Sequence, residues 1–158
     1  TDIRCVESCG SMSDNLIVAN WDLRFFGLAE HVAQWSKDPS TKVGAVIVND
    51  NKQVLSLGFN GFPRGVNDLT ARYQTRDIKL MFVAHAERNA LDNAPMDVRG
   101  GTMYATLCPC NECAKSIIQR GIKRVFAKKF EDPEQYKRFN ANYTVTMFKE
   151  ANVELVLV

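Results

Sequence analysis

The sequence predicts a single domain with a three-layer α/β/α fold built around a five-stranded mixed sheet. Its 158 residues match the usual size of one domain, and 46% hydrophobic residues suffice for one core. Helical and strand-like patterns of apolar residues alternate in the order α-β-β-α-β-α-β-α-β, which is typical of this fold class. The last segment, 153–158, is nearly all apolar, as expected of a buried strand.

The first half of the chain predicts a helix and a hairpin. Apolar residues recur at helical spacing over 21–35. The β-branched run 43–48 and the run 54–59 read as two strands joined by the turn 49–51. Residues 60–76 are polar, contain glycine and are long for a connection. We therefore expect a functional loop there.

The second half predicts alternating helices and strands. A glycine at position 121 follows the second of these helices, where a helix commonly ends. In chain order we expect helix 84–91, strand 102–106, helix 110–120, strand 124–127, helix 134–151 and strand 153–158.

Residues 1–11 lack apolar periodicity, and Gly10-Ser11-Met12 is typical of a cloning junction before an initiator methionine. We therefore expect 1–11 to be a foreign or disordered leader and 12–158 to be the domain. A native N-terminal extension is the alternative. On the first interpretation, Cys5 and Cys9 are not metal ligands of the fold.

Charge and hydropathy narrow the class of protein. The net charge of +2 and the lack of a basic stripe disfavour a dedicated nucleic-acid binder. A small phosphorylated substrate would need only a few local cations. No apolar run reaches the roughly 18 residues of a membrane span, and no secretory signal pattern begins the chain. We therefore expect a cytoplasmic protein.

Two short motifs predict a metal site. His85-Ala86-Glu87 and Pro109-Cys110-Asn111-Glu112-Cys113 together fit the H-x-E…P-C-x-x-C pattern of zinc deaminases. Cys110 and Cys113 are three residues apart at a predicted helix start, so both sulfurs can reach one ion and the thiolate form is favoured. Pro109 suits the first helical position.

The number of donors indicates catalysis. His85, Cys110 and Cys113 leave the fourth position of a tetrahedral zinc ion for water, whereas a structural site is closed by four ligands. Cys108 precedes the helix face, so we expect it to pack or to line the pocket. Glu87 is the candidate base, because a carboxylate near a metal-activated water can take its proton and return it to substrate.

Four segments resemble the cytidine and deoxycytidylate deaminases, and the likeness extends over 21–158. The zinc motifs indicate the superfamily. The narrower resemblance, to deoxycytidylate (dCMP) deaminases, comes from two upstream stretches. In chain order the segments are Ser36-Lys37-Asp38-Pro39-Ser40-Thr41-Lys42-Val43-Gly44-Ala45, Gly58-Phe59-Asn60-Gly61-Phe62-Pro63, His85-Ala86-Glu87-Arg88-Asn89-Ala90 and Cys110-Asn111-Glu112-Cys113-Ala114-Lys115.

The resemblance implies a cytidine-deaminase-like fold and hydrolysis of dCMP to dUMP and ammonia, which supplies dUMP for thymidylate synthesis. It implies that His85, Cys110 and Cys113 bind Zn²⁺ and that Glu87 shuttles the proton. It also implies a homo-oligomer, a hexamer, that is activated by dCTP and inhibited by dTTP.

The resemblance further implies a set of substrate- or effector-binding residues. Asn60 would bind the sugar or base, with a left-handed turn residue as the alternative. Lys42 and Arg64 are candidate phosphate partners or else solvated surface cations. Met96 stands near where some relatives carry a phosphate-binding arginine. Phe130 is a candidate for stacking on the base, although a core position is favoured. The full set is Lys42, Asn60, Gly61, Phe62, Arg64 and Ala86.

Two alternative functions stay open. A nucleic-acid deaminase acting on a flipped base, such as a tRNA adenosine deaminase, would carry a basic patch and bind with a steep salt dependence. The near-neutral charge speaks against it. A non-catalytic, zinc-stabilised nucleotide-sensing module would have no need for a base at Glu87.

Overall fold

The computed structural model describes residues 3–5 and 14–158, so the junction predicted at 10–12 lies outside the described residues. Its elements follow the predicted order, with additions at the N-terminus and between the hairpin and the first motif helix. They are β1 (Ile3–Cys5), α1 (Asp14–Ala33), β2 (Gly44–Val48), β3 (Val54–Phe59), α2 (Thr70–Gln74), α3 (Arg76–Phe82), α4 (Ala86–Asn93), β4 (Thr102–Ala105), α5 (Asn111–Gln119), β5 (Arg124–Ala127), α6 (Pro133–Arg138), α7 (Ala141–Glu150) and β6 (Glu154–Leu157).

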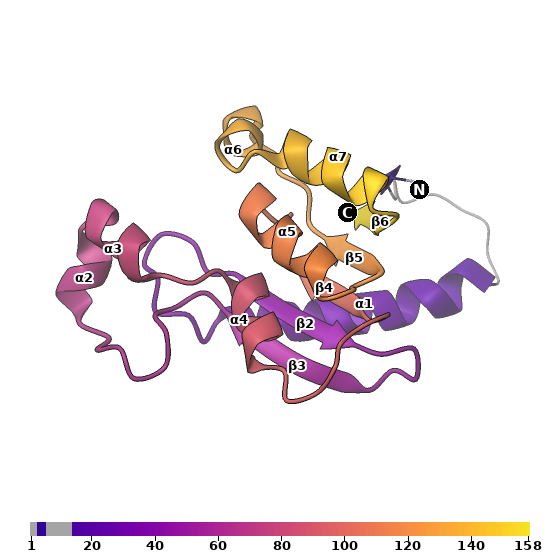
Figure 1. Ribbon diagram of the computed structural model, residues 1–158, viewed down its shortest axis with the longest axis horizontal. Helices are drawn as coiled ribbons and strands as arrows, with labels where there is room; N and C mark the ends of the chain where they lie inside the picture. Colours follow the sequence, from indigo (N-terminus) through magenta and orange to yellow (C-terminus); the bar gives the residue numbers. More distant parts are fainter. Residues whose placement is uncertain (1–2, 6–13) are drawn as a thin grey trace.

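The strands form one mixed sheet in the order β1-β6-β5-β4-β2-β3 (Figure 1). β2 is antiparallel to both β3 and β4, while β4, β5, β6 and β1 run parallel. The five predicted strands, β2 to β6, all form and confirm the predicted fold class. β1 adds a sixth strand from within the predicted leader 1–11. The edge of β6 offers free backbone groups, and a strand can pair with them whatever its side chains are.

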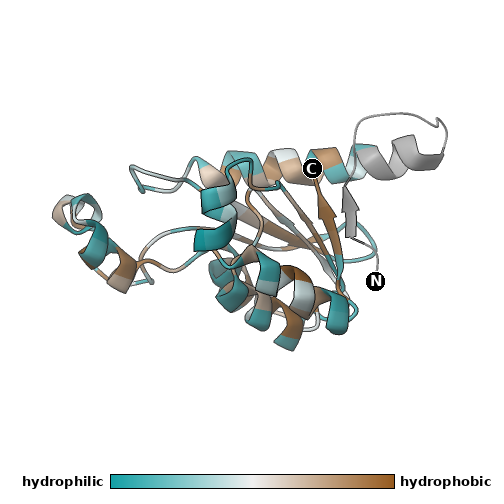
Figure 2. Ribbon diagram, turned by 90° about the horizontal axis from the view of Figure 1, so that it is seen from above, coloured by the Kyte–Doolittle hydropathy of each residue, from teal (hydrophilic) through white to brown (hydrophobic). Residues whose placement is uncertain are grey.

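Helices cover both faces of the sheet. α1 runs along one face, and α4, α5 and α7 lie across the other, which gives the three layers (Figures 1 and 2). Strand residues alternate between the faces, as the two-residue period of a strand requires. Ala45 and Ile47 of β2 point to the α4–α5 side, and Val46 and Val48 pack with α1.

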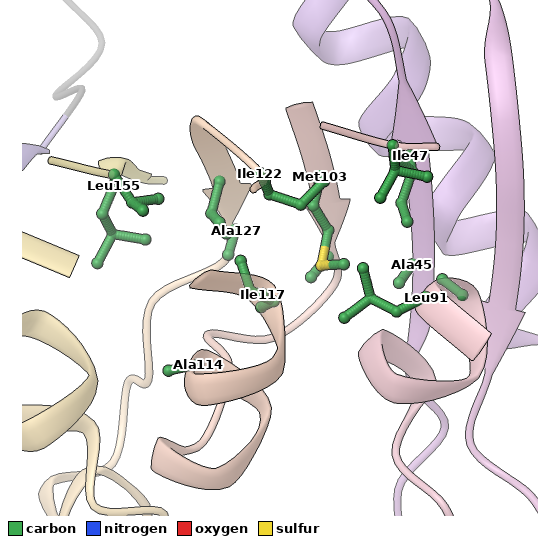
Figure 3. Close-up of a cluster of buried hydrophobic side chains, with 14 of the residues drawn as sticks. Ala45, Ile47, Leu91, Met103, Ala114, Ile117, Ile122, Ala127 and Leu155 are labelled. Carbon is green, nitrogen blue, oxygen red and sulfur yellow. The ribbon is translucent and has the colours of Figure 1, made fainter. Parts of the chain in front are cut away.

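The larger core lies between the sheet and the helices that carry the zinc motifs. Figure 3 shows side chains of β2, β4, β5 and β6 meeting those of α4 and α5. Leu91 of α4 and Ile117 of α5 are almost completely buried. Because both helices are anchored on the same sheet face, their starts are fixed relative to each other. The labelled residues are Ala45, Ile47, Leu91, Met103, Ala114, Ile117, Ile122, Ala127 and Leu155.

Two predicted segments differ from the structure. The single helix predicted over 134–151 is broken into α6 and α7, because Asn140 adopts a left-handed conformation with φ of 54°. Asparagine tolerates this conformation better than most residues. The predicted loop 60–76 contains α2, and α3 follows it directly; both lie apart from the sheet (Figure 1). Among the described helices, none is long and apolar enough to cross a membrane.

A buried ion pair fastens α1 to the sheet. Arg124 of β5 donates from Nη1 and Nη2 to the two carboxylate oxygens of Asp22, each at 2.8 Å. The hydroxyl of Tyr104 also donates to Asp22, at 2.7 Å. Only 8% of the Asp22 side chain and 19% of the Arg124 side chain are exposed. The paired geometry therefore stabilises the layer that lies opposite the zinc motifs.

Replacing Asp22 with asparagine should lower the free energy of unfolding by about 2–4 kcal/mol, because it leaves the largely buried guanidinium of Arg124 with the more distant carboxylate of Glu154, at 3.8 Å, as its remaining described partner. Urea denaturation would measure the change. The control is Asp50→Asn, which removes an exposed partner of Lys123 and should cost less than about 1 kcal/mol. Equal losses in the two variants would contradict the assignment of Asp22 as the anchor.

Candidate active site

The zinc motifs meet because two helices begin side by side. His85 is the N-cap of α4, and Cys110 is the N-cap of α5. The ligand atoms of His85, Cys110 and Cys113 all lie within 4.8 Å of one another. His85 Nδ1 is 3.4 Å from the Cys110 sulfur and 3.3 Å from the Cys113 sulfur. One nitrogen and two sulfurs thus converge on one point, as a single metal ion requires.

The local fold of the cysteine turn differs in one detail from the prediction. Pro109 precedes the N-cap and does not occupy the first helical position. Cys110 itself caps the helix, because its sulfur accepts the backbone N–H of Cys113 at 3.5 Å. The hydroxyl of Thr144 on α7 donates to the Pro109 carbonyl at 3.0 Å and holds the turn from outside. Both sulfurs therefore sit at the positive end of α5.

The hydrogen bonds between these side chains prepare a thiolate. Donation from the Cys113 thiol and from His85 lowers the pKa of Cys110, and the same bond raises the pKa of Cys113. Hydrogen bonding to Cys110 also raises the pKa of His85. These hydrogen bonds favour the thiolate form of Cys110. This donor set, neutral nitrogen with thiolate sulfur, is one that zinc prefers.

Glu87 lies in the first turn of α4, two residues after His85, and is only 4% exposed. Burial raises the pKa of its carboxyl group above the usual range for glutamate. A buried carboxyl with a raised pKa takes up a proton more readily than an exposed one, which favours a role in proton transfer. Its place beside the three donors agrees with the role predicted for it.

A cavity of about 530 Å³ opens over these residues. This volume lies in the usual range for small-molecule sites. Its walls come from the loop after α1, from α3, from the two motif helices and from α6. The lining residues are Asp38, Ser40, Thr41, Val43, Asn60, Arg76, Lys79, Leu80, Val83, His85, Ala86, Glu87, Leu107, Cys108, Cys110, Arg138 and Phe139.

Asn60 lines the cavity, but its side-chain amide forms hydrogen bonds with the backbone of a neighbouring loop. Its amide oxygen accepts the backbone N–H of Val43 at 2.8 Å, and its amide nitrogen donates to the Thr41 carbonyl at 2.9 Å. It therefore shapes the loop that forms one wall. The alternative of a left-handed turn residue is wrong: among the described residues, positive φ outside glycine occurs only at Lys52, Asn140 and Asn152.

The rest of the glycine-containing segment lies beside the cavity. Gly61 exchanges two backbone hydrogen bonds with Ala84, just before His85, at 3.1 and 2.8 Å. Phe62 stacks on Tyr73 of α2 with ring centroids 4.1 Å apart. Both contacts position the chain that leads into α4. Ala86, by contrast, lines the cavity directly.

The two cations predicted from the resemblance do not line the cavity. Arg64 donates to the side-chain oxygen of Asn93 at 3.0 Å. Lys42 lies at a smaller hollow of about 180 Å³, together with Lys128 and Lys129. Their predicted contacts with a phosphate group stay predictions.

Several cavity residues have no signal in the sequence that marks them as a site. Lys79 and Asp38 form a buried ion pair at 3.2 Å, yet they are 41 residues apart and share no motif. Phe130 stacks on Phe139 with ring centroids 5.3 Å apart, and Phe139 is the ring that lines the cavity. The break between α6 and α7 sets the position of Phe139. The periodicity of the sequence does not reveal this break.

Gly58 allows α4 to lie close to the sheet. A Cβ atom at this position of β3 would overlap the Ala86 carbonyl and the Ala90 nitrogen of α4. These are backbone atoms, so only movement of the helix could relieve the overlap. Because His85 and Glu87 open that helix, the glycine also fixes the site.

Gly58→Ala should lower the free energy of unfolding by about 1–3 kcal/mol through overpacking. It should also reduce catalytic activity, since α4 must shift. Thermal unfolding and a steady-state assay would measure the two effects. Gly27→Ala is the matched control, because nothing lies within 4 Å of a Cβ at that helical position. A Gly58→Ala protein as stable as the Gly27→Ala protein would refute the close-packing argument.

Comparisons with known proteins agree with this geometry. Residues 19–129 match the family profile described as the cytidine and deoxycytidylate deaminase zinc-binding region. The mouse deoxycytidylate deaminase is 43% identical over 136 residues, which cover 81% of this chain and 75% of that protein. An uncharacterized deaminase of Aliivibrio fischeri is 42% identical over 145 residues, or 88% of this chain and 94% of that protein.

A solved structure shows that the similarity extends to the three-dimensional fold. The dCMP deaminase of cyanophage S-TIM5, in complex with dCMP and dUMP, matches with a TM-score of 0.67 and 25% sequence identity. The match covers 94% of this chain and 100% of that one.

Proposed function

Because the chain belongs to the cytidine and deoxycytidylate deaminase family, we propose that it is a zinc-dependent hydrolase that converts dCMP to dUMP and ammonia. One observation carries the proposal. A buried glutamate, Glu87, lines a cavity of about 530 Å³ together with His85 and Cys110, two of the three converging metal donors. The relatives named as deoxycytidylate deaminases support dCMP as the substrate.

His85, Cys110 and Cys113 would hold the zinc ion. They supply three donors of types that zinc prefers, and among the described residues no fourth cysteine or histidine joins the group. Cys108 is near, but its sulfur contacts the Pro109 carbonyl at 3.8 Å. When bound, zinc with three protein ligands lowers the pKa of a water molecule to about 7 and so makes it a nucleophile at neutral pH.

Glu87 moves the protons of the reaction. Its carboxylate accepts a proton from the attacking water and delivers it to ring N3 of cytosine while the oxygen adds to C4. The carboxylate then takes the remaining proton of that oxygen and gives it to the amine. The C4–N4 bond breaks, ammonia leaves and the C4 carbonyl of dUMP forms. Burial suits Glu87 for this work, because it raises the pKa of the carboxyl group and so favours proton uptake.

The cavity wall supports binding of a flat pyrimidine. The ring of Phe139 borders the cavity and is backed by Phe130, so a base could stack on a rigid surface. Leu107 and Cys108, just before the cysteine turn, also line it. Their backbone carbonyls are candidate acceptors for the exocyclic amine.

Several finer properties stay predictions. These are activation by dCTP, inhibition by dTTP, assembly into a hexamer and a cytoplasmic location. Gel filtration with light scattering would test the hexamer. Adding each effector to the activity assay would test the regulation, with activation expected from dCTP and inhibition from dTTP.

The substrate is tested by ammonia release from dCMP, cytidine, dCTP and a tRNA anticodon stem, each with zinc-loaded protein. We expect turnover of dCMP and dUMP as its product. Release from the tRNA stem alone would favour a nucleic-acid deaminase. No release from any substrate, with zinc fully bound, would favour the nucleotide-sensing alternative.

A further inference from the structure

We propose that Lys79, Arg76 and Arg138 form an anion subsite that binds the 5′-phosphate of the substrate and makes the enzyme prefer a nucleotide to a nucleoside. The inference rests on the proposed function, since it assigns the group that grips the same substrate. All three cations line the cavity that holds His85 and Glu87. Arg76 ends the segment 60–76, which the sequence predicts to be functional, whereas Lys79 and Arg138 belong to no predicted motif.

Lys79 is the buried member of the subsite. Its side chain is 10% exposed, and among the described residues its ammonium has one hydrogen-bond partner, an oxygen of Asp38. An ammonium has three N–H donors, so the remaining donors are available in the cavity. The same Asp38 oxygen also accepts the backbone N–H groups of Ser40 and Thr41, at 2.8 and 3.3 Å. Asp38 balances the charge of Lys79, so Lys79 contributes hydrogen-bond donors to the subsite and the two arginines contribute its net positive charge.

Arg76 and Arg138 bring guanidinium groups from two separate helices. Arg76 lies three residues before Lys79 on α3, so the two share a helix face. Arg138 ends α6, and its guanidinium lies 5.1 Å from the ring centroid of Phe139. Neither arginine pairs with a carboxylate in the described part of the chain. A guanidinium can bind phosphate through two parallel hydrogen bonds.

The charge distribution of the cavity favours an anion at this place. Its carboxylates are Asp38, which is held by several donors, and Glu87, which lies beside the metal donors. The cations come from α3 and α6, whereas the metal donors come from the starts of α4 and α5. A nucleotide with its base at the metal donors would extend its phosphate toward Lys79, which pairs with Asp38, and toward two arginines that have no carboxylate partner among the described residues.

A second group of cations is an alternative binding site for the phosphate. Lys42, Lys128 and Lys129 border the smaller hollow, which adjoins the cavity along Thr41 and Leu107. Lys128 there has a carboxylate partner, Glu131, at 3.8 Å. The hollow includes none of the metal donors, so the cavity cations are the better phosphate partners.

The test measures dissociation constants of dCMP and deoxycytidine by calorimetry, in zinc-loaded protein that carries Glu87→Gln to prevent turnover. We expect dCMP to bind more tightly. Adding Arg76→Ala and Arg138→Ala should weaken dCMP relative to deoxycytidine by about 100-fold, because two charge-assisted contacts are lost. Lys79→Gln, which can still donate to Asp38, should reduce the same ratio by about 10-fold.

Two controls match these charge changes. Lys137→Ala removes the exposed neighbour of Arg138, and Lys128→Ala with Lys129→Ala removes two cations from the smaller hollow. Both should keep the ratio of the two dissociation constants. The inference is overturned if the hollow variant, and not the arginine variant, abolishes the preference. It is also overturned if the protein binds dCMP no more tightly than deoxycytidine.

Failure of the proposed function would give a different experimental result from failure of the anion subsite. Binding is measured in a variant without turnover, so it does not depend on deamination. A wild-type protein that binds dCMP through these cations and releases no ammonia would refute the proposed reaction and retain the anion subsite.

Discussion

Replacing Glu87 with glutamine is expected to lower kcat for dCMP by about 10³–10⁴-fold, because the buried carboxylate beside the metal donors is lost. Glutamine has nearly the same size, so the packing of α4 against the sheet is kept. Zinc content should not change, since Glu87 is not one of the three converging donors. Ammonia release and metal analysis of the same sample would measure the two quantities.

The control for this variant is Glu112→Gln. Glu112 also lies in the first turn of a motif helix, but it is exposed and pairs with Lys115 at 2.7 Å. Its activity should stay within about twofold of wild type, because an exposed ion pair contributes little. A Glu87→Gln protein as active as Glu112→Gln would mean that another group carries the protons.

Replacing Cys113 with alanine is expected to abolish both zinc binding and activity. The change leaves two protein donors, His85 and Cys110, where a catalytic zinc site has three. The loss of affinity should exceed the roughly 10–100-fold effect of changing a group outside the ligand shell. Zinc titration with a competing chelator would give the affinity, and ammonia release would give the activity.

The Cys108→Ala variant tests whether Cys108 is a metal ligand or a neighbouring thiol that binds no metal. Cys108 is not one of the three residues whose ligand atoms lie within 4.8 Å of one another, and its sulfur contacts the Pro109 carbonyl at 3.8 Å. The variant should therefore keep a full equivalent of zinc. Loss of zinc in Cys108→Ala, with retention in Cys113→Ala, would contradict the assignment of the ligands.

The metal donors could be predicted from sequence because their geometry is local. The spacing of Cys110 and Cys113 is one helical turn, and His85 and Glu87 lie two residues apart at another helix start. Burial on one sheet face then brings the two starts together. The hairpin was predictable for the same reason, since the β-branched run 43–48 and the run 54–59 are joined by a short turn.

The cation side of the cavity could not be predicted, because it depends on contacts between distant segments. Lys79 meets Asp38 across 41 residues, and the helix that carries it begins where a loop was expected. Arg138 reaches the cavity only because Asn140 breaks a helix that periodicity made continuous. Neither event has a signature in a short window of sequence.

The most direct test is the formation of dUMP from dCMP by the wild-type chain, with zinc occupancy measured in the same sample. We predict that protein with one zinc per chain forms dUMP and ammonia in equal amounts, and that a chelator stops the reaction until zinc is restored. Fully zinc-loaded, folded protein that forms no dUMP would contradict the central claim.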